Sequence, residues 1–454
     1  MDIGTLSLIL LIGMLVLLAI GMPLGFASGF LAVVVLFLKF GPDLLLSNFG
    51  TGPLNIIAQR MYGLTTDYVL ISVPLFIFMA TLLERSGIAR DMYNSLSVWM
   101  SRTRGGIAIV TAIMAIVMAA MSGIIGGEVV LLGLIALPQM LRLGYNQNLA
   151  IGTICASGSL GTMIPPSIVL IIYGLVTETS IHALFRAAFL PGFLLAGCYI
   201  IYIIIRTHMH PEQAPLPETE TRITFADKIK ALPGLLAPLL VVFVVLGSIY
   251  GGITGITEAA GMGTVAVLLL IIIRREFTLE LFREALMRTF KSTGTIIWVT
   301  FGATALAGAY SIAGGPAYVA NLIVGAELPT MGILLTMMVI FLFLGAFMDW
   351  VGIVLLVMPV FLPIVLKLPV EEMGLIGTIE PRFVAVWFGI LFCVNMQVSF
   401  LSPPFGPAAF YLKSVAPPHI SLPDIFRGFL PFIGIQLLIL TLVLLVPTIT
   451  TVFL

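Results

Sequence analysis

Two short stretches combine hydroxyl, amide and proline residues inside long apolar runs, and these are the residue types that could do chemistry here. Ser157–Ser167 reads SGSLGTMIPPS and Asn395–Phe405 reads NMQVSFLSPPF. Each double proline removes two backbone donors and clashes with the preceding helical turn, so a helix must break there. Backbone groups freed at membrane depth need protein, water or an ion as partners. A kinked helix repaired by its neighbours would explain one such stretch, but a second copy favours discontinuous helices that form a transport site.

The composition predicts an all-α polytopic membrane protein. Of 454 residues, 60% are hydrophobic and only 9% are charged, and apolar runs of about 20 residues recur along the chain. Twenty-one basic and twenty-one acidic residues cancel, which argues against a nucleic-acid partner. The three cysteines lie in apolar segments, where they are predicted to be small core residues, and they indicate neither a disulfide framework nor a metal site. The first apolar run lacks a basic leader, so we interpret it as a retained helix.

The elements around the two double prolines recur in the same order, which predicts two repeats. LPQMLRL at Leu137–Leu143 matches LPIVLKL at Leu362–Leu368, and the repeat runs in order along both halves. Each half has a Gly-rich candidate re-entrant hairpin followed by a broken helix. The predicted units are residues 1–205 with a hairpin at about 105–143 and a broken helix at about 148–177, a linker with a surface helix at 206–231, and residues 232–454 with a hairpin at about 331–366 and a broken helix at about 383–412.

Three more polar stretches are predicted to lie outside the membrane or along its surface. Gly41–Thr66 has the mixed pattern of a helix lying on the membrane surface. Glu84–Arg104 is a charged connection that precedes the first hairpin. Arg274–Lys291 is a charged amphipathic stretch, and Gly294–Ile312, which follows it, is predicted to span the membrane.

The distribution of basic residues predicts the orientation. Placing the linker in the cytoplasm, with hairpins that return to their own side, puts sixteen Lys and Arg residues inside and five outside. This arrangement places both termini outside and inverts the two halves relative to each other. Inverted halves, each with a hairpin and a broken helix, are typical of alternating-access transporters.

Four motifs in this order resemble those of the large membrane subunit of TRAP (tripartite ATP-independent periplasmic) transporters, of the ion-transporter group with an elevator mechanism. They are GSLGTMIPPSIVLIIYG at Gly158–Gly174, GITEAAG at Gly255–Gly261, LGAFMDWVGIVLLVMPVFLPIV at Leu344–Val365 and SPPFGPAAFYLKSVA at Ser402–Ala416.

The resemblance covers essentially the whole chain and implies a subunit of the bacterial inner membrane, with periplasmic termini, that couples Na⁺ to uptake of an organic acid. C4-dicarboxylates, 2-oxo acids, sugar acids and sialic acid are carried by such systems, and we expect one of the first two. The implied partners are a periplasmic binding protein, a small membrane subunit that we expect as a separate chain, and membrane lipids. One departure is the first hairpin tip, SGIIGGE at Ser122–Glu128, which has fewer serines than is usual in the family. This shifts ion binding there toward backbone carbonyls.

The broken backbone suggests where ions and substrate bind, because exposed carbonyls suit Na⁺ and exposed N–H groups suit a carboxylate. The first predicted Na⁺ site comprises Ser122, Gly123, Ser157, Ser159 and Gly161. The second comprises Gly345, Met348, Asp349, Asn395, Ser399 and Ser402. The predicted substrate-binding residues are Ser159, Thr162, Pro165, Gln397 and Pro403. Pro166 and Pro404 are predicted to act as structural breaks. No lone buried arginine is evident that could clamp a carboxylate.

Three acidic residues lie in apolar surroundings, where a charge is costly and is by default a functional candidate. The position of Asp349 at the second hairpin tip favours a functional role. Glu128 could be a ligand, or it could stabilise the start of a helix electrostatically. Glu258 follows Thr257 at the start of a span, which favours helix capping.

Other classes of protein fit the sequence less well. A membrane enzyme would need a nucleophile–base pair or a metal constellation, and none is apparent. A channel fits the hydropathy but not two broken helices in inverted halves. A Na⁺/carboxylate symporter that works alone, without a binding protein, is the remaining alternative.

Overall fold

The computed structural model describes residues 2–41, 52–216, 224–325 and 328–454, and every regular element in these ranges is helical. Seven helical segments in them are long and apolar enough to cross a membrane. The predicted all-α polytopic architecture is therefore confirmed. Part of the predicted surface helix at Gly41–Thr66 lies outside the described residues, and the rest forms α4 (Pro53–Thr65).

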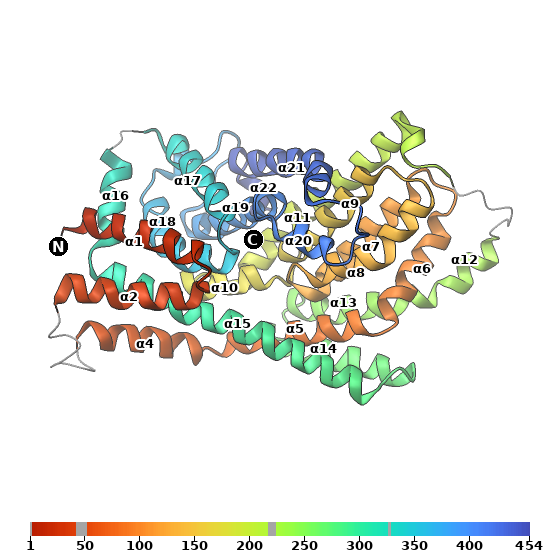
Figure 1. The fold of residues 1–454 in the computed structure, drawn as a ribbon, viewed down its shortest axis with the longest axis horizontal. Helices are drawn as coiled ribbons and strands as arrows, with labels where there is room; N and C mark the ends of the chain where they lie inside the picture. The colour runs from red at the N-terminus through yellow and green to blue at the C-terminus, as the bar shows by residue number, and fades with distance from the viewer. Residues whose placement is uncertain (1, 42–51, 217–223, 326–327) are drawn as a thin grey trace.

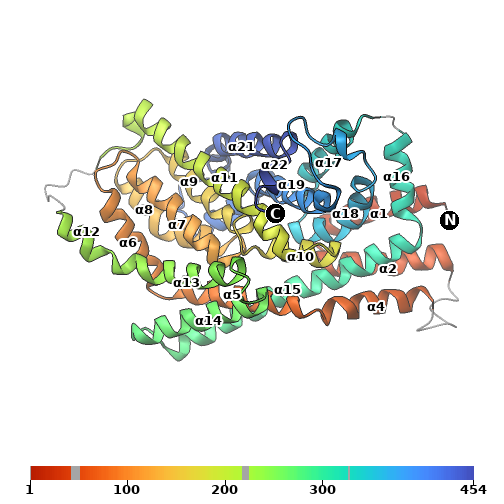
Figure 2. The ribbon, with the colours of Figure 1, turned by 180° about the vertical axis from the view of Figure 1, so that it is seen from behind.

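Long helices form an outer layer along one side of the molecule (Figures 1 and 2). Its members pack against one another and are α2 (Leu24–Phe40), α4, α5 (Ser72–Arg85, preceded by a 3₁₀ turn at Tyr68–Ile71), α13 (Pro233–Tyr250), α14 (Ile256–Ile273) and α15 (Leu279–Ile312). Helix α1 (Ile3–Ala19) packs on α2. These helices keep many large apolar side chains exposed, as expected where lipid surrounds a protein.

The remaining long elements form a core bundle against this layer. It contains two hairpins, which are α7 (Gly106–Ser122) with α8 (Gly127–Arg142) and α17 (Thr330–Gly345) with α18 (Trp350–Val365). The hairpins lie toward opposite ends of the long axis (Figure 1). Helices α11 (Ile181–Met209) and α21 (Leu422–Leu445) complete the bundle, and α22 (Thr448–Thr451) ends the chain. In the apolar segment Pro381–Leu401, which includes α19 (Val384–Leu401), 94% of an 18-residue stretch is buried inside the protein. The corresponding share for α13 is 28%, so the bundle holds the hydrophobic core.

Both double prolines interrupt helices. The first broken helix consists of α9 (Gln147–Ser159), a 3₁₀ turn at Leu160–Thr162 and α10 (Ile168–Thr177). The second consists of a 3₁₀ turn at Pro381–Phe383, α19 and α20 (Pro407–Lys413). The side chain of Ser167 caps α10, accepting the Leu170 N–H at 3.4 Å. Pro166 and Pro404 therefore lie in the non-helical backbone between paired helix segments, where the sequence places the breaks.

Two connecting helices link the outer layer to the hairpins, and the sequence does not predict either of them. Helix α6 (Ile88–Met100) occupies much of the expected charged connection, because Ile88, Ala89, Met92 and Tyr93 form an apolar face that packs on neighbouring helices. Helix α16 (Gly315–Gly325) leads toward the second hairpin. The linker holds α12 (Phe225–Ala231), which lies on α6, with the Lys228 ammonium 5.7 Å from the Trp99 ring centroid. Short 3₁₀ turns at Pro211–Gln213 and Val370–Glu372 complete the described elements.

Most of the charged amphipathic stretch predicted at Arg274–Lys291 and the whole span predicted at Gly294–Ile312 belong to a single helix. Residues Leu279–Ile312 form one helix of 34 residues, α15, which begins where the Thr278 side chain accepts the Leu281 N–H at 3.1 Å. No proline lies within it, so the amphipathic start and the apolar remainder form one continuous helix.

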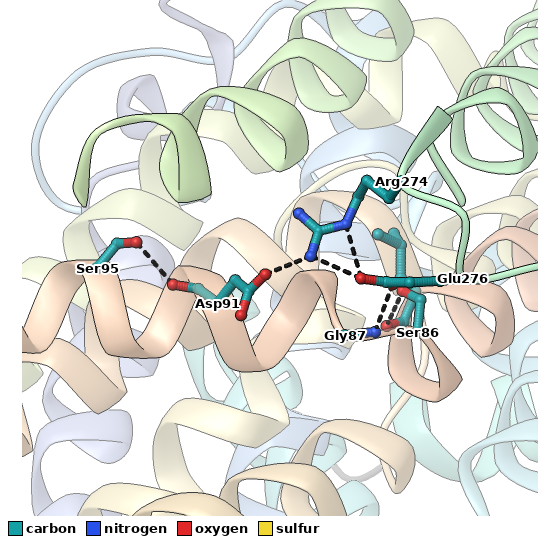
Figure 3. A network of polar contacts seen from close by, with 7 residues as sticks. Ser86, Gly87, Asp91, Ser95, Arg274 and Glu276 are labelled. Carbon is teal, nitrogen blue, oxygen red and sulfur yellow. Dashed lines mark hydrogen bonds and ion pairs between the residues drawn. The ribbon is translucent and has the colours of Figure 1, made fainter. Parts of the chain in front are cut away.

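A polar network fixes the turn between α5 and α6 to the turn between α14 and α15 (Figure 3). Arg274 pairs with Asp91 and also with Glu276, whose Oε1 lies 2.8 Å from Nη2. The other Glu276 oxygen accepts the Gly87 N–H at 3.0 Å. The connecting helix α6 therefore starts from a fixed point on the outer layer.

Candidate functional site

The tip of the first hairpin docks directly onto the first helix break. Gly123 ends α7 in the left-handed conformation, with φ of 68°, and its carbonyl accepts the N–H of Ile168, the first residue of α10, at 3.0 Å. A Cβ at position 123 would lie 2.6 Å from the Pro166 carbonyl oxygen, so only glycine fits there. Both elements of the first predicted site therefore meet as the sequence suggests.

Oxygen atoms converge on Gly161 at this junction. A Cβ built on Gly161 would lie 2.9 Å from Glu128 Oε1, 2.9 Å from the Ile124 carbonyl oxygen and 3.1 Å from Glu128 Oε2. Glu128 is buried, and its Oε1 accepts a hydrogen bond from the Ser122 hydroxyl. Among the described residues Glu128 Oε2 has no hydrogen-bond partner, and neither does the buried Ser157 hydroxyl. We call the Ser122, Ile124, Glu128 and Gly161 group the cradle, and its chemistry suits a small hard cation.

Ser159 does not belong to the cradle but joins the two broken helices. Its hydroxyl lies 2.8 Å from Gln397 Oε1, and the Gln397 amide donates to the Thr162 hydroxyl at 2.6 Å. All three side chains are buried. Three predicted substrate-binding residues thus lie together, and their polar groups are bonded to one another in this conformation.

The second hairpin tip meets the second broken helix less closely. A Cβ on Gly345 would overlap the Ser399 hydroxyl, so these two predicted residues touch. The Asn395 amide donates to the Met338 carbonyl at 2.9 Å, and within the described structure its buried Oδ1 has no partner. Ser402 donates to the Val398 carbonyl at 2.8 Å. This second group therefore has a buried amide oxygen and a close contact at Gly345, but none of these residues supplies a buried carboxylate.

Asp349 and Met348 lie at the edge of this second group. Asp349 occupies the N-cap position of α18, where its charge suits the helix dipole, and it is exposed. In the part of the chain that the structure describes, no hydrogen bond joins Asp349 to Asn395, Ser399 or Ser402. Met348 lines a small apolar groove between α1, α15 and α18.

The two double prolines differ in their surroundings. Pro165 and Pro166 are buried, whereas Pro403 and Pro404 are exposed together with Phe405. The first break is thus closed over by protein, and the second is open.

The predicted capping role of Glu258 is wrong. Helix α14 starts at a glycine N-cap, Gly255, with no side-chain cap hydrogen bond. Glu258 instead accepts a hydrogen bond from the Tyr68 hydroxyl at 3.0 Å, which connects α14 to the start of the α5 segment.

Sequence reasoning also missed three residues around the first tip, namely Glu84, Arg288 and Tyr411. Glu84 and Arg288 form an ion pair of 2.8 Å at the hairpin, and the Tyr411 ring lies over Gly126. The glycine pair Gly126–Gly127 was the available signal, because adjacent glycines often mark a place where other groups approach the backbone closely.

A cavity of about 600 Å³ lies away from the cradle, between α4, α10, α15 and α18. Its lining includes Arg60, Asp67 and Glu178, together with apolar residues of α18. The cavity is lined by residues of both the outer layer and the core bundle, and none of the predicted site residues is among them.

Comparison with known proteins decides the family. The family model for the DctM component of the tripartite ATP-independent periplasmic transporter matches residues 11–449. This chain belongs to the DctM family.

Curated relatives and a solved structure agree with this assignment. A C4-dicarboxylate TRAP transporter large permease of Pseudomonas aeruginosa is 29% identical over 405 residues, covering 88% of this chain and 90% of the relative. A sialic acid TRAP transporter large permease of Vibrio cholerae is 28% identical, covering 96% of each. The Alcanivorax borkumensis YdaH transporter has a similar fold, with a TM-score of 0.56, 14% identity and coverage of 93% and 96% of the two chains. This DctM-family protein is therefore a multi-pass transporter permease and not an enzyme.

Proposed function

We propose that this chain is the large permease of a Na⁺-coupled system that takes up an organic acid of the C4-dicarboxylate or 2-oxo acid type. The observation that carries the proposal is the cradle, where a buried carboxylate oxygen without a partner faces a backbone carbonyl next to a helix break. A buried carboxylate is costly unless a proton or a cation compensates its charge. In a transporter family, a co-transported cation meets that need.

The first Na⁺ ion would bind in the cradle. Glu128 supplies charge, Ser122 orients that carboxylate, and the Ile124 carbonyl and the unpartnered Ser157 hydroxyl supply further oxygens. Gly161 keeps the space free because any side chain there would displace the ion. Gly123 serves as the hinge of the tip and Ser159 as a link to the second half, so these two predicted ligands would act indirectly.

A second Na⁺ ion would bind where Gly345 meets α19. Asn395, whose Oδ1 has no hydrogen-bond partner among the described residues, and Ser399, whose hydroxyl lies against Gly345, would supply oxygen ligands. Ser402, Met348 and Asp349 would lie at the rim of this site. The substrate would bind beside the exposed Pro403, because the first break is closed and Ser159, Thr162 and Gln397 already bond to one another.

The family description, a tripartite periplasmic transporter, supports two partners for this chain. We infer a small membrane subunit as a separate chain and a periplasmic binding protein that delivers the acid. The basic-residue bias favours an inner-membrane orientation with periplasmic termini. Alternating access would come from an elevator movement of the core bundle against the outer layer.

Uptake into proteoliposomes tests the proposal. The chain would be reconstituted with its small subunit and given labelled succinate, pyruvate or N-acetylneuraminate, with and without an inward Na⁺ gradient and the binding protein. Uptake that needs both Na⁺ and the binding protein is expected. Uptake with Na⁺ but without the binding protein would indicate a stand-alone symporter, and uptake indifferent to Na⁺ would contradict the coupling.

A further inference from the structure

An ion pair of the outer layer lies directly against the first hairpin tip. Glu84 is in the last turn of α5, and Arg288 is in the first third of α15. Their Oε2 and Nη1 atoms are 2.8 Å apart, and the side chains are 9% and 39% exposed. The carboxylate is therefore nearly buried, whereas the guanidinium keeps part of its surface open.

The first hairpin tip presents two glycines, Gly126 and Gly127, where the Glu84–Arg288 pair approaches it. A Cβ on Gly127 would overlap the Glu84 carboxylate. A Cβ on Gly126, which has φ of 124°, would lie 3.0 Å from Cζ of Tyr411 in α20. Tyr411 and the Glu84–Arg288 pair therefore lie against neighbouring glycines of the same tip. Arg288 thus stands where the outer layer, the first tip and the second broken helix meet.

Stability alone gives a weak reason for this pair. The nearly buried Glu84 carboxylate loses hydration that its attraction to Arg288 often fails to recover. The same two helices are already joined by Arg85 and Glu284, whose Nη1 and Oε2 atoms lie 2.6 Å apart and whose side chains are 44% and 46% exposed. Arg85–Glu284 is therefore an exposed counterpart one residue further along α5, and only the Glu84–Arg288 pair contacts the tip glycine.

The chemistry of Arg288 matches an anionic ligand. A guanidinium has five N–H donors in a planar fork that fits a carboxylate through two parallel hydrogen bonds. In the described structure Glu84 is the ion-pair partner of Arg288, and part of the Arg288 side chain remains exposed. The carboxylate of Glu84 is chemically equivalent to the anionic group of an organic acid.

We propose that Arg288 receives the anionic group of the transported acid and that Glu84 occupies Arg288 until the acid displaces it. The inference rests on the proposed function, since it requires an acidic substrate. Glycines at positions 126 and 127 let the tip move past the pair without a side chain to block it. Arg288 would remain with the outer layer and so contact the acid only at one stage of the core movement.

Substitutions of Glu84 and Arg288 should change the affinity for the acid in opposite directions, which distinguishes this role from a structural one. If Glu84 competes with the substrate, Glu84→Gln frees Arg288 and strengthens acid binding, whereas Arg288→Gln weakens it. Hydrogen bonds to charged groups contribute about 1.5–3 kcal/mol, so the loss in affinity should be roughly tenfold or more. A purely structural pair would make both variants less stable and would leave acid affinity unchanged in each.

The test measures thermal stabilisation of the purified permease with its small subunit as succinate, pyruvate or N-acetylneuraminate is titrated. With the acid that wild type transports, Arg288→Gln should need at least about tenfold more acid for half-maximal stabilisation. Arg288→Lys should fall between Arg288→Gln and wild type, because it keeps the charge but loses the fork. Glu84→Gln should need less acid than wild type, and Arg85→Gln should match wild type.

Several outcomes would overturn the inference. Equal acid affinity in wild type and Arg288→Gln would do so while leaving the proposed function intact. A wild type that neither transports nor binds any acid of the panel would overturn both. If Arg288→Gln does not fold, Glu84→Gln decides, because unchanged or weaker acid binding in that variant contradicts the competition.

Discussion

The two broken helices share a double proline but have different surroundings. Around the first break, Pro165 and Pro166 are buried, and the tip above them holds Glu128 inside the cradle. Around the second break, Pro403 and Pro404 are exposed, and the acid of the nearby tip, Asp349, is exposed as well. The difference shows that a double-proline break can be closed over by protein beside a buried carboxylate in one half and lie at an exposed surface in the other.

The contacts between each hairpin tip and its broken helix also differ between the two halves. In the first half, the tip carbonyl of Gly123 bonds to the start of α10, so hairpin and break are locked together. In the second half, the tip touches α19 through Gly345 and Ser399, whereas the non-helical backbone beyond Leu401 remains open. The second break is therefore more accessible than the first in this conformation.

The largest expected difference between the breaks is the reactivity of introduced thiols. Ser167 and Phe405 occupy corresponding positions after the two double prolines and are 0% and 57% exposed. With Cys198 replaced by Ala, a cysteine introduced by Phe405→Cys should react with a maleimide in detergent about a hundredfold faster than one introduced by Ser167→Cys, because a buried thiol reacts only after local opening. Equal rates would contradict the closed first break.

Filling the cradle should have the next largest effect. Gly161→Ala would place a methyl group 2.9 Å from two oxygens, so the half-saturating Na⁺ concentration for uptake should rise by at least about tenfold. Gly294→Ala is the matched control, since among the described residues nothing beyond the local helix backbone lies within 4 Å of its added methyl group. A similar Na⁺ dependence in both variants would place the cation elsewhere.

The buried link between the halves should contribute measurably to stability. Gln397→Leu leaves the Ser159 and Thr162 hydroxyls without their amide partner, which should destabilise the protein by about 1–3 kcal/mol. Unfolding in detergent, followed by circular dichroism, would measure the loss.

A change at the open break should have the smallest effect. Ser402→Ala removes one half-buried hydroxyl that bonds only within its own helix, and the expected loss is below about 0.5 kcal/mol. If Ser402→Ala destabilises the protein as much as Gln397→Leu does, the open description of the second break is wrong.

Local sequence signals predicted the elements that bring the site together. Double prolines and glycines act on their own backbone, so the interruptions after Ser159 and Leu401 and the end of α7 at Gly123 could be located without a structure. The charged stretches were harder to interpret. Helix α6 was interpreted as a charged connection, because its apolar face is evident only when its neighbours are known. The charged amphipathic stretch at Arg274–Lys291 was recognised as amphipathic, but its continuity with the following span in α15 was not predicted.

Contacts between distant parts of the chain could not be predicted in the same way. Glu84 meets Arg288 and Ser159 meets Gln397 only because α5 packs on α15 and the two broken helices cross. The sequence left Glu128 open between a ligand and a helix-end role, and its burial with a free oxygen is what favours the ligand. The sequence favoured a functional role for Asp349. In the structure Asp349 is the exposed N-cap residue of α18, at the edge of the second hairpin tip.

The most direct test of the buried cation site is a Na⁺ titration of the purified protein, read as thermal stabilisation at constant ionic strength with choline as the replacement cation. Wild type should be stabilised by Na⁺, and Glu128→Gln should need at least about tenfold more Na⁺ for the same shift. Asp349→Asn, the corresponding change at the exposed tip, should stay close to wild type. Stabilisation that survives in Glu128→Gln but disappears in Asp349→Asn would contradict a closed cation site at the first break.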